Sequence, residues 1–337
     1  MIRELLEKLF RREDLSAGEA EAAMGAVMTG QLTPAQVAGL LTALAMKGER
    51  PSEVVGFARA MRAHALSLGA AVPGVFDTCG TGGDRAGTFN ISTTAAFVAA
   101  GGGLTVAKHG NRSVSSKSGS ADVLAALGVK IDLPTQRIED CVNDVGIGFL
   151  FAPLFHGAMK HCAAPRQDMG IRTLLNILGP LTNPAGATIQ ALGVYDGNLT
   201  EVMARVLIHL GTQHCFVVHG MDGLDEITLT DRTRVSEGKA GVVSSYFIEP
   251  EEFGLQRVKM KELAGGSAEE NAQITKDILK GRKSPKQDIV CLNAAPVFVA
   301  SGKAKNLQEG FALAGKAIDS GAAMQKLEQL IAFTNKP

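Results

Sequence analysis

Apolar residues recur at helical spacing through the first part of the chain. Between residues 2 and 10 they lie three or four positions apart, as on one face of an amphipathic helix. Residues 16–19 and 33–36 have the sequence of capping boxes, and the second carries proline at the first helical position. We therefore predict that residues 1–70 form a small all-helical domain.

The pattern changes near residue 72, where short apolar runs begin to alternate with helical runs. The predicted strands are 75–79, 104–107, 147–151, 189–195 and 215–219, and the predicted helices between them include 92–100, 120–127 and 199–210. Such alternation is typical of an α/β domain with a mostly parallel central sheet, whose ligands lie at the carboxyl ends of the strands.

The rest of the chain completes a two-domain prediction. A helical stretch at about 165–185 is expected to join the small domain, which leaves 71–164 and 186–337 for the larger α/β domain. After residue 237 the sequence favours a β segment over 240–247, a helix capped by Ser267, and two closing helices that end near residue 333.

Composition excludes several classes of protein. Lys+Arg 34 balances Asp+Glu 34, so the chain lacks the basic field of a nucleic-acid-binding protein. No apolar run approaches the roughly 18 residues of a membrane span. The five cysteines form no C-x-x-C pair, which favours reduced thiols, and the first residues do not resemble a signal peptide. We expect a cytoplasmic protein without a nucleic-acid or membrane partner.

Two glycine-rich loops carry the candidate chemistry. Residues 80–84 (GTGGD) and 108–116 (KHGNRSVSS) each follow a predicted strand. Glycines let backbone N–H groups approach an anion closely, and the hydroxyls, amides and cations nearby add donors. The first loop lacks the lysine of a P-loop, and Arg85 breaks the dinucleotide fingerprint. Together the loops indicate a ligand that carries phosphate at more than one point.

Acidic and basic residues elsewhere extend this interpretation. Asp225 and Glu226 follow a predicted strand and suit Mg²⁺ held against phosphate oxygens, although a solvated turn has the same sequence character. Arg166 or Arg172 is a candidate for binding a substrate carboxylate in bidentate fashion. The alternative is that these arginines pair with the surrounding helices.

The order of motifs resembles that of the anthranilate phosphoribosyltransferase family. The motifs are GTGGD, NxST, KHGNRxxSSxxGSAD, GIRTxxNxLGPLTNP and DGLDE, and the similarity extends over essentially the whole chain. The resemblance implies transfer of the phosphoribosyl group of phosphoribosyl pyrophosphate to the anthranilate amine, with Mg²⁺ and release of pyrophosphate, in tryptophan biosynthesis. It also implies two ions per site when the donor is bound, and a homodimer formed through the helical domain. Binding to an anthranilate synthase subunit is left open.

Carried over motif by motif, the resemblance assigns three groups of residues. The residues that would bind phosphoribosyl pyrophosphate are Gly80, Gly83, Asp84, Thr88, Asn90, Ile91, Ser92, Thr93, Lys108, His109, Gly110, Asn111, Arg112, Ser113, Val114, Ser115, Ser116 and Ser120. Those that would contact anthranilate are Gly80, Asn111 and Arg166, and those that would hold the metal are Ser92, Asp225 and Glu226.

Two positions bear on the expected mechanism, one as a general base and one near the acceptor. His109 is the candidate general base, and structural support of its loop is an equal alternative. Gly157 follows His156 where the family usually has proline, so the choice of acceptor is less constrained than the phosphate site. We expect in-line displacement with inversion and no covalent enzyme intermediate.

Two competing functions would require different features of the sequence. A pyrimidine-nucleoside phosphorylase resembles the family in fold, but it would need nucleobase contacts in place of the 108–116 loop. A non-enzymatic relative that binds nucleic acid would show a basic surface and degraded motifs, whereas this chain is neutral and its motifs are whole.

Overall fold

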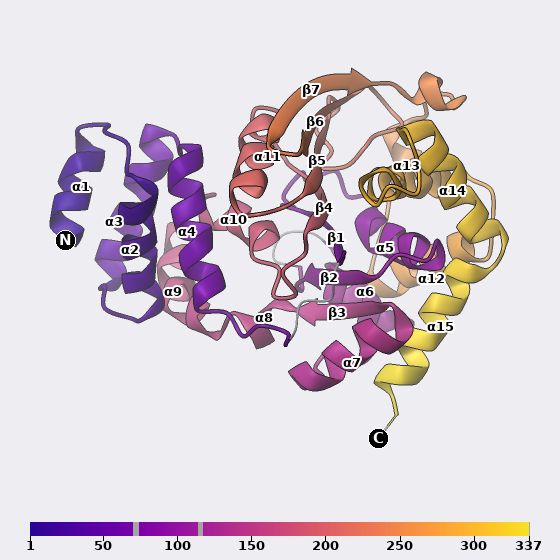
Figure 1. Cartoon of the computed structure of the whole chain (residues 1–337), viewed down its shortest axis with the longest axis horizontal. Helices are drawn as coiled ribbons and strands as arrows, with labels where there is room; N and C mark the ends of the chain where they lie inside the picture. The colour runs from indigo at the N-terminus through magenta and orange to yellow at the C-terminus, as the bar shows by residue number, and fades with distance from the viewer. Residues whose placement is uncertain (70–73, 114–116, 337) are drawn as a thin grey trace.

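A computed structural model describes residues 1–69, 74–113 and 117–336. A bundle of helices lies at one end, and a larger body built on a twisted sheet lies at the other (Figure 1). The first four helices of the bundle are α1 (Ile2–Phe10), α2 (Ala17–Met28), α3 (Pro34–Lys47) and α4 (Pro51–Ala63).

Side-chain caps begin these helices as the sequence predicts. The Ser16 hydroxyl accepts a hydrogen bond from the Glu19 amide, and Thr33 caps α3 in the same way. Helix α9 (Lys160–Met169) packs against α2 and α3, and the short α10 (Leu175–Leu178) contacts α4. The stretch predicted to return to the helical bundle therefore contacts it.

A seven-stranded sheet forms the centre of the larger body. Its strands are β1 (Phe76–Gly80), β2 (Val106–Gly110), β3 (Ile147–Phe151), β4 (Ile189–Gly193), β5 (His214–Gly220), β6 (Thr233–Lys239) and β7 (Val242–Ile248). They lie in the order β3-β2-β1-β4-β5-β6-β7, and the first five in that order are parallel. The prediction of a mostly parallel sheet is confirmed, with every predicted strand within two residues of the observed start.

The antiparallel edge of the sheet differs from the prediction. The β structure predicted over 240–247 is present as β7, but β6 was not predicted, and Ala240 and Gly241 form a turn at positive φ between the two strands. Strand β6 was not predicted because it is rich in polar residues, whose side chains form hydrogen bonds to the neighbouring strands. Ser236 bonds to Ser245 on β7 at 2.8 Å, for example.

Helices cover both faces of the sheet. Helices α5 (Ile91–Gly101), α13 (Pro285–Ala300), α14 (Leu307–Asp319) and α15 (Ala322–Thr334) pack together in the main core. Helix α12 (Ala268–Leu279) precedes them, begins at the predicted Ser267 cap, and contacts α6 (Ser120–Leu127). In the described part of the chain three helices follow α12, so the prediction of two closing helices was wrong.

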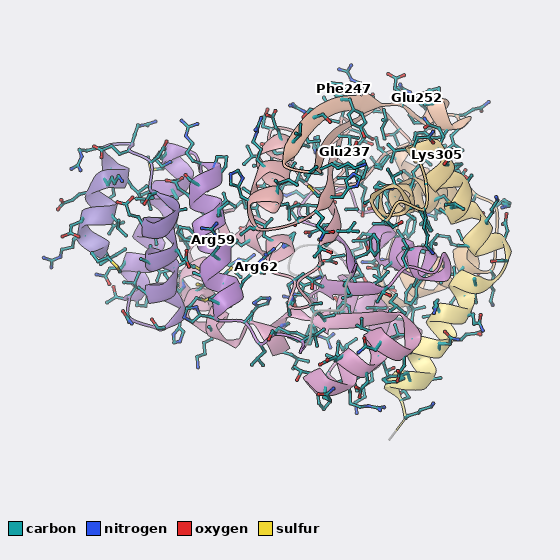
Figure 2. All side chains as sticks on the ribbon, viewed as in Figure 1. Arg59, Arg62, Glu237, Phe247, Glu252 and Lys305 are labelled. Carbon is teal, nitrogen blue, oxygen red and sulfur yellow. The ribbon has the colours of Figure 1, made fainter. Side chains whose placement is uncertain are left out.

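Helix α7 (Thr135–Val145) lies beside β3, and α11 (Leu199–His209) joins the sheet to the helical bundle. Helix α11 contacts β5 and β6 on one side and α4 on the other. From the last turn of α4, Arg62 donates hydrogen bonds to the carbonyls of Leu181 (2.7 Å) and Leu210 (3.0 Å). Figure 2 shows Arg62 on the side of α4 that faces the larger body.

The structure also bears on membrane insertion. Of the helices formed by the described residues, none has both the length and the apolar character needed to cross a lipid bilayer.

Candidate functional site

The polar loops of the larger body gather at one edge of the sheet. The five parallel strands all end there, so the segments that follow β1, β2 and β4 are neighbours. Strand β1 lies between β2 and β4, so the strand order runs from β1 to β2 and β3 on one side and from β4 to β5 on the other. The order of the strands therefore reverses at β1. Such a switch point opens a crevice at the carboxyl ends of the strands.

The first glycine-rich loop is fixed by hydrogen bonds to two other segments. The Thr81 amide donates to the carbonyl of Gly193 at 2.9 Å, and the Thr81 hydroxyl accepts from the Tyr195 amide at 3.2 Å. The Gly82 amide donates to Oδ2 of Asp225 at 2.7 Å. A Cβ on Gly193 would lie 1.6 Å from the Asp225 carbonyl oxygen, so glycine is required there for the acidic loop to approach.

The second loop is organised by an acid at the start of α6. Oδ2 of Asp122 accepts from the amides of Ser113 (3.0 Å) and Gly119 (2.9 Å), and Oδ1 pairs with Arg112 at 2.9 Å. The Asn111 amide donates to the Ser120 hydroxyl at 3.2 Å. Asp122 thus shapes the loop without having been predicted as a site residue. Three predicted residues of this loop lie outside the described part of the chain: Val114, Ser115 and Ser116.

The start of α5 joins the two loops and the acidic loop. Asn90 precedes the helix, and its Nδ2 donates to the Ser118 carbonyl at 3.1 Å. The Ser92 amide donates to Oε1 of Glu226 at 3.1 Å. Of the predicted donor residues on this helix, Ile91 and Thr93 are buried. Their side chains pack in the core and leave the backbone and Ser92 for ligand contact.

Three carboxylates lie close together beside the first loop. Burial, reinforced by the neighbouring Asp84, raises the pKa of Asp225 to about 7. Burial and the charge of Asp225 also raise the pKa of Glu226 well above its usual range, against the opposing effect of Lys108. Acids that repel one another in this way are costly to ionise until a cation compensates them.

The donor set suits Mg²⁺ better than a metal held by protein alone. In the described part of the chain, no three His, Cys, Asp or Glu side chains are grouped closely enough to hold a metal ion. Mg²⁺ commonly takes only one or two carboxylates and completes its coordination with water and substrate phosphates. Asp225 and Glu226 therefore fit Mg²⁺, whose remaining ligands would come from water and a phosphate-bearing ligand.

A buried lysine lies beneath the loops. The Nζ atom of Lys108 donates to the Thr78 carbonyl, and its charge opposes the rise in the pKa of Asp77 that burial causes. Oδ1 of Asp77 accepts from the His109 amide at 3.2 Å, and its Oδ2 has no hydrogen-bond partner within the described residues. Asp77 was missed because it stands inside a predicted strand rather than in a loop.

The histidine proposed as a base has an unusual environment. The ring centroids of His109 and His156 are 5.1 Å apart, and burial together with His156 lowers the pKa of His109 to about 3. His109 is therefore neutral near pH 7 and is a weak base. Gly157, next to His156, has open space around it, since a Cβ there would meet no atom within 4 Å.

The structure distinguishes the two candidate arginines. Arg172 donates to the Gly83 carbonyl and stacks over the Tyr195 ring, with Cζ 4.4 Å from the ring centroid. The guanidinium of Arg166, on α9, makes no hydrogen bond or ion pair with the described part of the chain. Its guanidinium therefore remains available for a ligand.

Comparison with known families defines the class of protein. Residues 3–65 match the helical bundle domain of a glycosyl transferase family, and residues 72–324 match the a/b domain of that family. Fold and site thus agree in defining a glycosyl transferase with a helical domain and an α/β domain.

Individual relatives narrow this class. Anthranilate phosphoribosyltransferase of Desulfosudis oleivorans is 55% identical over 335 residues, covering 99% of each chain. The Moorella thermoacetica protein of that name is 52% identical over 99% of this chain and 98% of its own. The chain belongs to the anthranilate phosphoribosyltransferase family, which confirms the resemblance seen in the motifs.

Solved structures agree with this assignment. The crystal structure of anthranilate phosphoribosyltransferase from Thermus thermophilus is 46% identical and has a TM-score of 0.93, covering 98% of this chain and 99% of its own. The Saccharomyces cerevisiae enzyme in complex with PRPP and Mg is 30% identical, with a TM-score of 0.90 and coverage of 99% and 97%. Another structure of the yeast enzyme, 28% identical, contains 4-fluoroanthranilate. The predicted fold class, a small helical domain with a larger α/β domain, is confirmed.

Proposed function

We propose that this chain transfers the phosphoribosyl group of phosphoribosyl pyrophosphate to the amine of anthranilate and releases pyrophosphate. The observation that carries the proposal is the joining of two glycine-rich loops to one pair of acids. Asp225 bonds to the first loop, and Glu226 bonds to the start of the helix whose cap, Asn90, bonds to Ser118, two residues past the second loop. A ligand with phosphate at two points and a bound cation fits that arrangement.

The donor would bind along these loops, through the residues assigned from Gly80 to Ser120. Mg²⁺ would be held by Ser92, Asp225 and Glu226, as two ions when the donor is present. The yeast relative in complex with PRPP and Mg supports a metal at this site. When bound, the metal would stabilise the charge that grows on the departing pyrophosphate.

The chain's own groups would orient both substrates. Backbone N–H groups of the loops and the cation of Lys108 favour an anion at the carboxyl edge of the sheet. Anthranilate would contact Gly80 and Asn111, with its carboxylate on Arg166. The aromatic amine is a weak nucleophile, so alignment behind the anomeric carbon supplies much of the acceleration. His109 is neutral and would act as a hydrogen-bonding neighbour rather than as a strong base.

The proposed activity is tested by following anthranilate fluorescence with enzyme, donor and Mg²⁺, each omitted in turn. Loss of fluorescence that requires all of them is the expected result. If fluorescence persists while the donor still binds in calorimetry, the acceptor assignment is wrong and other aromatic amines should be screened. Inversion is tested separately by the anomeric configuration of the product, and retention would contradict in-line displacement.

The helical bundle would also form the contact between two copies of the chain. Phe10 on α1 and Met46 on α3 are each 72% exposed, so the bundle presents apolar side chains that a second copy of the chain would cover. Sedimentation of the protein and of a Phe10→Ser, Met46→Ser variant should show a dimer and a weakened dimer. A wild-type monomer at micromolar concentration would refute this part of the proposal.

Two further parts of the proposal concern the domains and the compartment. We assign residues 1–70 and about 165–185 to the small domain and the remainder to the α/β domain. Limited proteolysis should then cut first near the boundaries. The cytoplasm is the proposed location, and fractionation of the source cells would test it.

A further inference from the structure

A strap from a distant part of the chain lies along the donor-binding segment. Residues 264–271, just before and within the start of α12, run beside residues 87–90, which precede α5. The Gly265 amide donates to the Gly87 carbonyl at 2.9 Å. One antiparallel β-bridge pairs Thr88 with a strap residue. Residues 264–271 lie outside all five sequence motifs quoted above.

The strap approaches closely enough to require glycine. A Cβ on Gly265 would lie 2.5 Å from the Phe89 nitrogen and 2.6 Å from its Cα. Lys286 holds the other side, because its Nζ donates to the Ala264 carbonyl and lies 5.3 Å from the centroid of the Phe89 ring. The segment that carries Thr88 and Asn90 therefore rests on the strap.

Asn271 is the polar centre of this contact. It is 2% exposed, and its Oδ1 accepts from the Gly266 amide at 2.8 Å. Its Nδ2 donates to Oδ1 of Asn90 at 3.0 Å, and Asn90 in turn donates from Nδ2 to the Ser118 carbonyl at 3.1 Å. The side-chain oxygen of Asn90 also accepts from the Ser118 hydroxyl at 3.4 Å, and its NH₂ group faces the Ser118 carbonyl, just after the second loop.

We infer that Asn271 is a positioning residue for the phosphoribosyl donor and that it acts through Asn90. Its carboxamide donates the shorter of the two hydrogen bonds that Oδ1 of Asn90 accepts, and the Asn90 amide joins the start of α5 to Ser118, two residues past the second glycine-rich loop. Removing it leaves Oδ1 of Asn90 with only the 3.4 Å bond from the Ser118 hydroxyl among the described residues, which weakens the link between the segments that the donor must span. The inference rests on the proposed function, since the ligand used to test it is phosphoribosyl pyrophosphate.

The test compares two substitutions at the same site. Asn271→Leu removes both hydrogen bonds at nearly constant volume. Asn271→Asp keeps an acceptor for the Gly266 amide but turns an acceptor toward Oδ1 of Asn90, and it serves if the leucine variant does not fold. Losing one buried hydrogen bond at a ligand-orienting residue should raise the donor Kd about 10-fold in calorimetry with Mg²⁺. The KM for anthranilate should rise less than the donor Kd, because the arginine proposed for the anthranilate carboxylate, Arg166, lies on α9 against the helical bundle rather than on these loops.

A matched control lies one turn further along α12. The Thr275 hydroxyl bonds to that of Thr94 on α5 at 3.0 Å, so Thr275→Val also removes one buried bond between the same two helices. It should lower the melting temperature as Asn271→Asp does but leave the donor Kd unchanged. Equal weakening by both substitutions would overturn the inference, because general loosening of α12 would then explain the effect.

A double substitution asks whether Asn271 works through Asn90. If it does, Asn90→Ala with Asn271→Leu should bind the donor no more weakly than Asn90→Ala alone, since coupled residues are not additive. Losses that multiply would overturn the inference, as would Asn271 variants that bind as wild type does. Failure of the wild-type chain to bind the donor would instead overturn the proposed function.

Discussion

Replacement of Arg166 by alanine gives the sharpest test of the proposed acceptor site. Among the described residues the Arg166 guanidinium has no hydrogen bond or ion pair, so its removal costs only the packing of its half-buried side chain. The melting temperature should therefore stay within about 1 °C of wild type, as expected for a change of less than about 0.5 kcal/mol. Any large effect must then appear in ligand binding.

The size of that effect follows from the contact proposed. A charge-assisted hydrogen bond is worth about 1.5–3 kcal/mol, so loss of the carboxylate contact should raise the KM for anthranilate about 10- to 150-fold. Arg166→Lys keeps the charge but loses the planar fork, and it should fall between wild type and alanine. Initial rates from anthranilate fluorescence at saturating donor give these values directly.

Arg172→Ala is the matched comparison for Arg166→Ala, because the Arg172 guanidinium already makes contacts within the protein. Arg172→Ala removes the bond to the Gly83 carbonyl and the stacking on Tyr195, so it should disturb the first loop and weaken the donor. Arg166→Ala should leave the donor Kd unchanged. An unaltered anthranilate KM in Arg166→Ala would show that another group binds the carboxylate.

Three further predictions concern buried and paired charges. Lys108→Met should weaken donor binding in calorimetry and lower stability by about 1–3 kcal/mol in denaturant unfolding, because the buried Thr78 carbonyl loses its donor and the buried Asp77 loses a nearby positive charge. Glu53→Gln should lower the stability of the helical bundle by about 3 kcal/mol, measured by hydrogen exchange in α2 and α4. The reason is that the wholly buried Glu53 carboxylate accepts hydrogen bonds from two backbone amides and pairs with a lysine. The hydrogen bond from Lys8 lowers the pKa of Glu19 to about 2 from 4.5. That pair should stabilise the fold above pH 4.5 and lose this effect as the pH falls toward 2. The stabilisation should be less than about 1 kcal/mol because both side chains are partly exposed. Glu19→Gln should abolish this part of the acid dependence in pH-dependent unfolding.

The parallel core could be predicted because its strands are buried and carry short clusters of apolar residues. Strands β1 to β5 are almost wholly buried, and although polar residues such as Asp77, Lys108 and Gln190 interrupt them, each ends at a glycine or a polar loop. Strand β6 could not be found this way. Its Glu237 bonds to His214 on β5 at 2.7 Å and to Tyr246 on β7 at 3.1 Å, and such cross-strand partners are invisible in a linear pattern.

The same distinction applies to the site. The loops were found because glycines, hydroxyls and charges are concentrated in short stretches of sequence. Their supports were missed because each reaches the loops from a separate element. Asp77 stands in a strand, Tyr195 follows another, and Asn271 lies 181 positions from Asn90, its hydrogen-bond partner. Sequence spacing carries no information about contacts of that range, which only the assembled sheet and helices create.

Under the proposed function, the charges at the site make donor and metal interdependent. Asp84, Asp225 and Glu226 would repel the phosphates of the donor, and the buried Lys108 already faces Asp77 and Glu226. A cation must therefore lie between these acids and the donor for both to occupy the site. Equally, among the described residues no third acidic, histidine or cysteine side chain is grouped with a pair of acids to hold a metal ion, so phosphate oxygens and water would complete the coordination of Mg²⁺. Each ligand would therefore favour binding of the other.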